Sequence, residues 1–174
     1  LHPQSDQAGP VSYLLSTDAW LYIMTSDSAY PAKSDGPSKG LAAVATRKWA
    51  EDVDMNLVHI SIITYGEILV IHRASRSNLA LQYELKSAID SLETSSGEEL
   101  ILNLTSEDMS HWASIYGSLD ANSDLALEDS FVLAQALCQG FTYVGQRTDV
   151  IDTIEGIGLN FLDPEEWQSA QSSK

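Results

Sequence analysis

The sequence contains a single cysteine, Cys138, among its 174 residues. One cysteine cannot form an internal disulfide framework, and it cannot build a zinc cluster of cysteine ligands. A reducing, intracellular compartment is therefore expected, and the cytoplasm is the predicted location. Cys138 lies on an apolar helical pattern next to a glycine, so we predict a buried and unreactive thiol.

Basic residues are also scarce, since nine Lys and Arg stand against 25 Asp and Glu, for a formal net charge of −16. Proteins hold nucleic acid phosphates largely through basic side chains, so this balance argues against a protein that grips a phosphate backbone unaided. This acidic charge balance is compatible with a divalent cation site, with a basic partner or with a protein that functions at high salt. Most of these charges are expected to form a solvated acidic surface.

Long apolar runs are missing as well. The richest segment, ISIITYGEILVI at residues 60–71, is interrupted by polar residues and a glycine, so no membrane helix is expected. The opening residues 1–10 lack the basic start and apolar core of a signal peptide, and they are predicted to be a flexible tail. The apolar fraction of 44% suits one globular domain, which we place at residues 11–167 with a second tail at 168–174.

Strand-like and helix-like segments alternate along this domain. The segments that read as buried strands are residues 11–15, 58–62, 100–104, 141–145 and 157–162. Amphipathic helical patterns separate them, with Asp18 as the expected cap of the first helix, a capping box at Thr105 and Asp108, and Gly140 as a helix end. Strands separated by helices predict an α/β fold, a three-layer α/β/α sandwich around a central parallel sheet.

Acidic residues recur where the predicted strands end. In a parallel α/β sheet, ligands are bound at the carboxyl ends of the strands and at the starts of the following helices. The places that qualify are residues 16–18, 64–67, 128–129 and 145–149. Carboxylates brought together at this edge would suit a hard cation such as Mg²⁺ or Mn²⁺.

Four segments, taken in order, resemble a known family. They are YLLSTDAWL, SIITYGEIL, EDSFVLAQALCQGFTYVGQRTDVI and the closing LNFLDPEEW. They are similar to motifs of the PIN-domain family, in particular the VapC-type toxins of toxin–antitoxin pairs. Those motifs are LLDTN, S-x-(I/V)-T-x-x-E-L, D-x-x-I-A-A…A…GL-x-(L/I)-V-T-x-N-x-x-x-F and a terminal G-L-x-x-E-D-W. The resemblance extends from Val11 to Trp167 and implies a PIN-like fold.

The resemblance also implies an activity, that of an endoribonuclease in which acidic residues hold Mg²⁺ or Mn²⁺ and the ion activates water. Glu67 and Asp129 match the second and third acids of the family. The first acid falls on Ser16, and the fourth falls near Arg147, which has the opposite charge. We therefore expect a partly depleted metal site.

Two carboxylates near the vacant positions are candidates to replace the missing acids. The predicted catalytic residues are Asp18, Glu67 and Asp129, and the predicted metal ligands are these three together with Asp149. The partners implied by the resemblance are an RNA substrate, an antitoxin protein and a second copy of the chain in a homodimer.

Other readings of these residues stay open. Asp18 and Asp149 would also serve as helix caps, and Glu67 and Asp129 as solvated carboxylates near helix N-termini. Arg147 could hold a phosphate or pair with a neighbouring carboxylate. The alternative functions are a catalytically inactive PIN-like module that binds a partner protein or RNA, and a flavodoxin-like response or ligand-binding domain, which rests on fold analogy alone.

Overall fold

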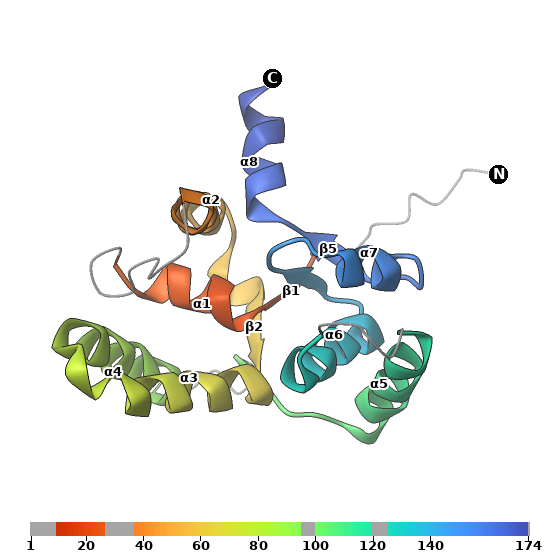
Figure 1. The fold of residues 1–174 in the computed structure, drawn as a ribbon, viewed down its shortest axis with the longest axis horizontal. Helices are drawn as coiled ribbons and strands as arrows, with labels where there is room; N and C mark the ends of the chain where they lie inside the picture. The colour runs from red at the N-terminus through yellow and green to blue at the C-terminus, as the bar shows by residue number, and fades with distance from the viewer. Residues whose placement is uncertain (1–9, 27–36, 95–99, 120–124, 174) are drawn as a thin grey trace.

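The computed structural model describes residues 10–26, 37–94, 100–119 and 125–173. Within them, one sheet of five parallel strands lies between two layers of helices (Figure 1). The strands are β1 (Tyr13–Leu15), β2 (Val58–Ser61), β3 (Ile101–Leu102), β4 (Thr142–Val144) and β5 (Asn160–Leu162), in the spatial order β3-β2-β1-β4-β5. The predicted α/β sandwich with a central parallel sheet is confirmed.

The helices of the described residues divide between the two faces of the sheet. They are α1 (Thr17–Met24), α2 (Pro37–Glu51), α3 (Ile62–Ala74), α4 (Leu79–Thr94), α5 (Ser106–Ser118), α6 (Leu127–Gln139), α7 (Asp149–Glu155) and α8 (Pro164–Ser172). Figure 1 shows α1 to α4 on one side of the sheet and α5 to α7 on the other. None of these helices is long and apolar enough to cross a membrane, among the residues described.

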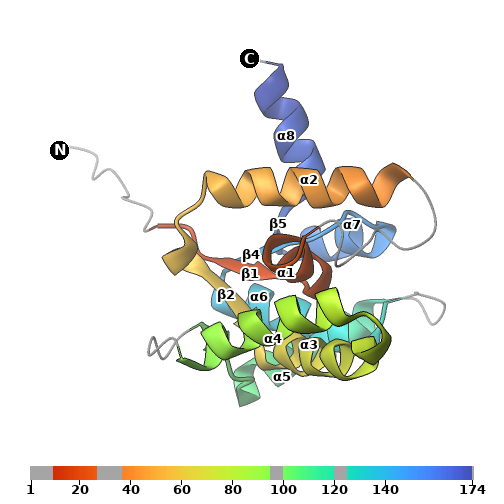
Figure 2. The same ribbon diagram turned by 90° about the vertical axis from the view of Figure 1, so that its left-hand side faces the viewer.

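The core has two halves because neighbouring side chains of a strand point to opposite faces. Leu15 of β1 is buried with Trp49 and Leu85 on the side of α1 to α4, while Leu14 is buried with Leu133 and Ile154 on the side of α6 and α7. Both faces of the sheet are therefore covered, as expected of a parallel sheet. Beyond the sheet, α8 rises along α2 and away from the rest of the fold (Figure 2).

Helix boundaries correct several details of the sequence prediction. Ser16, rather than Asp18, caps α1, because its side chain accepts the backbone N–H of Ala19 at 3.1 Å. Thr148, rather than Asp149, caps α7. In both places the chain offers adjacent cap-forming residues, and the extended backbone that a cap requires falls on the earlier one.

Other local predictions can be compared with the structure. The capping box of Thr105 and Asp108 is present, and Gly140 ends α6 with a φ of 70°, so both are confirmed. Residues 168–172, predicted as part of a tail, are helical within α8. The predicted tail at residues 1–10 falls almost wholly outside the described residues. Cys138 is half-buried, and desolvation raises its pKa to about 11, so the thiol stays protonated near neutral pH.

Candidate active site

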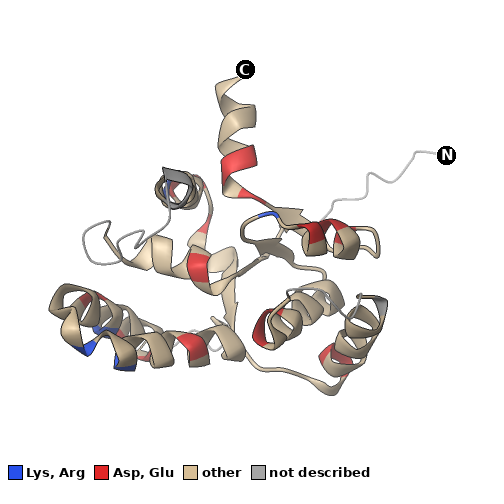
Figure 3. Cartoon of the chain, in the orientation of Figure 1, with Lys and Arg blue, Asp and Glu red and all other residues tan. Residues whose placement is uncertain are grey.

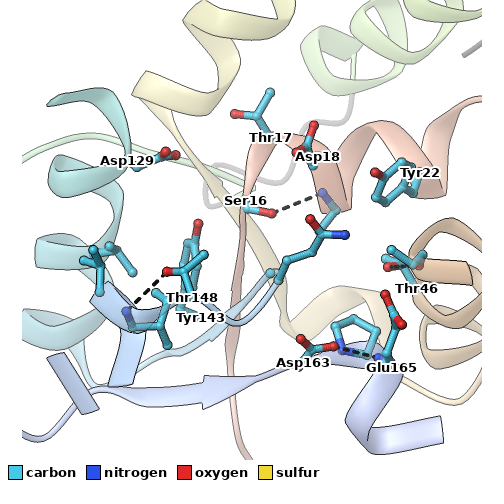
Figure 4. Close-up of a pocket in the computed structure, with 18 of the residues that line it drawn as sticks. Ser16, Thr17, Asp18, Tyr22, Thr46, Asp129, Tyr143, Thr148, Asp163 and Glu165 are labelled. Atoms are coloured by element: carbon cyan, nitrogen blue, oxygen red, sulfur yellow. Dashed lines mark hydrogen bonds between the residues drawn. The ribbon is translucent and has the colours of Figure 1, made fainter. Parts of the chain in front are cut away.

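A cavity of about 460 Å³ opens at the carboxyl ends of β1 and β4. Its walls come from α1, α2, α3, α6, the start of α7 and the start of α8 (Figure 4). The carboxylates among its lining residues are Asp18, Glu67, Asp129, Asp163 and Glu165. No Lys, Arg or His is found among the described residues that line it. The cavity is therefore walled by negative charge without a basic side chain of its own.

The three predicted catalytic acids reach this cavity from three separate helices. Asp18 comes from the first turn of α1, Glu67 from α3 and Asp129 from the first turn of α6. Figure 3 shows acidic residues on all three helices. Within the described ranges, however, no three His, Cys, Asp or Glu side chains lie close enough together to hold a metal ion. The acids share one cavity and do not form a closed ligand cluster.

Glu67 is fixed in place by a residue of another helix. The hydroxyl of Thr17, the first residue of α1, donates a hydrogen bond to Glu67 Oε2 at 2.5 Å. Burial raises the pKa of Glu67, the hydrogen bond from Thr17 counteracts this, and the negative charge of Asp129 raises the pKa further. Glu67 is thus a half-buried, anchored carboxylate facing other carboxylates, rather than a freely solvated one.

Asp129 has a similar environment on the opposite wall. It is partly buried, and desolvation raises its pKa, with further increases from Asp18 and Glu128. Two neighbouring carboxyl groups whose pKa values are raised by burial and by like charge indicate a site with excess negative charge. A cation between them would relieve that repulsion.

Arg147 does not supply this cation. Its guanidinium pairs with Asp152 and Glu155 at 2.6 Å each and with Glu166 at 2.8 Å. It also lies over the ring of Phe161, 4.9 Å from the centroid. These hydrogen bonds, led by the one with Glu155, raise the pKa of Arg147 above its usual range. The interpretation of Arg147 as a partner of neighbouring carboxylates is confirmed, and its side chain is not part of the cavity lining.

Asp149 is the predicted ligand that the structure does not bring to the cavity. It is exposed at the start of α7 and is absent from the described lining residues. Two carboxylates that were not predicted are present instead. Asp163 caps α8 by accepting the N–H of Glu165 at 2.8 Å, and it also accepts the N–H of Arg147. Both acids belong to the closing segment LNFLDPEEW.

Tyr143 is a further lining residue that the sequence did not predict. It stands in β4, is only 6% exposed, and lines the cavity together with Ser16. Figure 4 shows the hydroxyl of Tyr143 between Ser16 and Asp129. Burial, followed by the charge of Asp129, raises the pKa of Tyr143 far above its usual range. The motif quoted above has Leu or Ile at this position, so a tyrosine there was the available signal.

The donor set fits a hard divalent cation in its chemistry. Mg²⁺ and Mn²⁺ prefer carboxylate oxygens and keep several water ligands, which lets them bind where protein ligands are few. Glu67 and Asp129 offer such oxygens under mutual repulsion, with Asp18 on the same cavity. Because no three acids are close enough at present, these side chains would have to approach one another around an ion.

Comparisons with known proteins bear on the fold. No family model matches the chain, and a search of curated proteins finds no match. Among solved structures, FitAcB from Neisseria gonorrhoeae is similar with a TM-score of 0.57 and 18% identity, over 87% of this chain and 97% of that chain. VapBC-1 from nontypeable Haemophilus influenzae has a TM-score of 0.59 and 16% identity, over 88% and 98%.

A third structure agrees with these two. VapBC2 from Rickettsia felis, bound to a DNA fragment from their promoter, has a TM-score of 0.55 and 14% identity, over 87% of this chain and 98% of that chain. At such identities the likeness establishes the fold. The chain therefore has the PIN-like fold of these proteins, with an acidic cavity at the carboxyl end of its sheet.

Proposed function

We propose that this chain is a toxin-type PIN nuclease, a Mg²⁺- or Mn²⁺-dependent endoribonuclease with a partly depleted acidic site. The observation that carries the proposal is that Asp18, Glu67 and Asp129 line one cavity although they lie far apart in the sequence. The similarity of the fold to FitAcB and VapBC supports the same reading.

In the proposed mechanism, Glu67 and Asp129 would hold the ion and Asp18 would contribute from the wall of α1. When bound, the ion would activate water and stabilise the charge that develops on the phosphodiester. The hydrogen bond from Thr17 favours the ionised form of Glu67 and fixes the position of its carboxylate. Asp149 is outside the proposed set because it does not line the cavity in the described part of the chain.

The ion would also have a role in binding the substrate. A phosphate backbone approaching Asp18, Glu67 and Asp129 meets negative charge, and no described basic side chain lines the cavity to offset it. Affinity for nucleic acid normally depends on neutralising phosphates. RNA binding at this site should therefore require the divalent ion.

We propose an antitoxin as the protein partner. Solved structures similar to this chain include FitAB bound to an IR36 DNA fragment and a DNA-bound VapBC from Salmonella typhimurium, and their names imply two components. On α4, Leu79 is 75% and Tyr83 is 77% exposed, one helical turn apart, which makes an apolar surface available to a partner. A homodimer stays a prediction from the sequence resemblance.

One observation favours the alternative of an inactive PIN-like module. Ser16 stands where the family resemblance expects the first acid, and no three described acidic side chains are close enough to hold an ion. Such a module would bind a partner protein or RNA without cutting. The two readings differ in whether a divalent ion binds at the cavity.

RNA cleavage by four forms of the protein tests the proposal. We expect the wild type to cut RNA in Mn²⁺ and to stop in EDTA, and we expect Glu67→Gln and Asp129→Asn to lose most of the activity, about a hundred-fold or more. Glu128→Gln is the matched control, because Glu128 neighbours Asp129 in α6 but is exposed and does not line the cavity. Equal cutting by all four forms would mean that the cutting does not come from this site, and no Mn²⁺ binding by the wild type would favour the inactive module.

A further inference from the structure

Ser16 and Tyr143 form a pair of hydroxyl groups at the base of the cavity. β1 and β4 are neighbours, with Leu14 opposite Tyr143 and the N–H of Ser16 donating to the carbonyl of Val144 at 2.9 Å. Residues two apart in a strand share a face, so Tyr143 and Gly145 face the same side of β4. The tyrosine ring thus rises next to Gly145, and the side chain of Ser16 lies beside the same glycine.

Gly145 provides the space for this pair. A Cβ atom built on Gly145 would lie 3.0 Å from Cε1 of Tyr143 and 3.3 Å from Oγ of Ser16, which is closer than ordinary carbon contacts. Any other residue would therefore push the ring or the serine aside. The motif quoted for the family has Thr at this place, Leu or Ile at 143 and Asp at 16. Three differences from that motif consequently meet at one contact.

The pair has at least one hydrogen-bond donor more than it can use internally. Ser16 Oγ accepts the N–H of Ala19, and Ser16 and Tyr143 each carry a hydroxyl proton. Any contact between the two hydroxyls can use at most one of these protons. A tyrosine hydroxyl keeps its proton at neutral pH. At least one proton of the pair is therefore left to be donated to a further acceptor at the cavity, to which both residues contribute.

We propose that the Ser16–Tyr143 pair contacts the substrate by donating this hydrogen bond to a phosphate oxygen of the RNA strand. The inference rests on the proposed nuclease function. A phosphate near Asp18, Glu67 and Asp129 needs neutral donors as well as a cation, and a hydroxyl pair supplies a donor without adding charge. A carboxylate at position 16 would accept hydrogen bonds and repel the phosphate. Ser16 is then part of a working substrate contact, and Tyr143 supplies the second hydroxyl of the pair.

Removal of the tyrosine hydroxyl tests the inference on the full-length chain. The RNA affinity of Tyr143→Phe is measured in Mn²⁺ by fluorescence anisotropy with a labelled 2′-O-methyl RNA, and the Mn²⁺ affinity is measured separately by calorimetry. A hydrogen bond to a charged group corresponds to about a ten-fold change in affinity or more. We expect the RNA affinity to fall by about ten-fold and the Mn²⁺ affinity to change by less than about two-fold. Ser16→Ala should likewise lower the RNA affinity and leave the Mn²⁺ affinity almost unchanged.

The matched control is Tyr83→Phe, because Tyr83 is an exposed tyrosine of α4 and does not line the cavity. It should change neither affinity. If Tyr143→Phe binds RNA as well as the wild type, the inference is wrong and the nuclease proposal stands. If it loses Mn²⁺ affinity and melting temperature together, the pair has only a structural role and the inference is again wrong. If the wild type binds neither Mn²⁺ nor RNA, both proposals are wrong.

Discussion

Ser16→Asp should strengthen Mn²⁺ binding and weaken the metal-free fold at the same time. The structure allows this substitution. Asp is as good a helix cap as Ser, so α1 should still begin at Thr17 with Ala19 donating to the new side chain. Gly145 has no side chain to obstruct the larger group. The principal change is a new negative charge at a cavity already lined by Asp18 and Asp129.

The magnitudes follow from the charges. Two unit charges about 4 Å apart interact by about 4 kcal/mol at an effective dielectric constant of 20, and a divalent ion doubles this to about 8 kcal/mol. Desolvation of the new carboxylate opposes the gain, and we take about a quarter, about 2 kcal/mol, to remain. That corresponds to about thirty-fold tighter binding. Without metal, repulsion reduced by solvent screening to about 1 kcal/mol should lower the melting temperature by about 2–4 °C.

Calorimetric titration with Mn²⁺ and thermal unfolding with and without the ion measure both effects. Ser16→Asn is the matched control, since it has the same shape and capping ability without the charge. The asparagine variant should resemble the wild type in both assays. If the aspartate and asparagine variants bind Mn²⁺ equally, the cavity is not a cation site controlled by charge, and the electrostatic reasoning is refuted.

Three further predictions concern residues in contact with the same cavity. Asp129→Asn should raise the metal-free melting temperature by about 1–2 °C near neutral pH and by less near pH 4. The reason is that the pKa of Asp129 is raised in the folded protein, so the fold loses stability as pH rises and this carboxyl group ionises. Solvent screening keeps the effect small. Gly145→Ala should destabilise the fold by about 1–3 kcal/mol in denaturant unfolding because its Cβ would crowd the ring of Tyr143. Thr17→Val should weaken Mn²⁺ binding about five-fold in mildly acidic buffer, and less as pH rises, because losing the hydrogen bond raises the pKa of Glu67 further.

Each of these predictions has its own control. Glu128→Gln removes a neighbouring exposed charge and should raise the melting temperature less than Asp129→Asn does. Adding Tyr143→Leu to Gly145→Ala should recover most of the lost stability, and no recovery would mean that the crowding lies elsewhere. Thr17→Ser keeps the hydroxyl and should bind Mn²⁺ like the wild type. A loss as large as that of the valine variant would contradict the role given to the hydrogen bond.

Much of the fold follows from the sequence because burial leaves a pattern in it. A strand covered on both faces must be apolar throughout, and the apolar run that includes Leu14 and Leu15 has this property. Gly140 marks the end of α6 because glycine readily adopts a positive φ, and Thr105 and Asp108 mark the start of α5 because their side chains bond to backbone N–H groups. These signals are local, so a single sequence contains them.

The cap of α1 was assigned wrongly because Ser16 and Asp18 are both strong cap formers. What decides between them is the backbone, which is extended at Ser16 with a φ of −65° and a ψ of 162°. That conformation depends on how β1 ends in the sheet, since the N–H of Ser16 is bonded to Val144. Sequence pattern alone does not contain this contact.

The candidate site was likewise predictable from the sequence only in part. The order of strands predicted that Asp18, Glu67 and Asp129 would approach one edge, and all three line one cavity. The direction of Arg147 was not predictable, because it depends on ion pairs with carboxylates of α7 and α8. The hydroxyl of Tyr143 depends likewise on side-chain packing beside Gly145. Topology places the elements, and rotamers decide which of their side chains face the cavity.

Anomalous scattering from a crystal grown in Mn²⁺ is the most direct test of the proposed metal site. We predict a manganese peak in the cavity, bound by the carboxylates of Glu67 and Asp129 with Asp18 nearby, and we predict that Asp129→Asn abolishes it. A peak at Asp152 and Glu155 instead, or none in the cavity at a saturating concentration of Mn²⁺, would contradict a divalent-ion nuclease site in this protein.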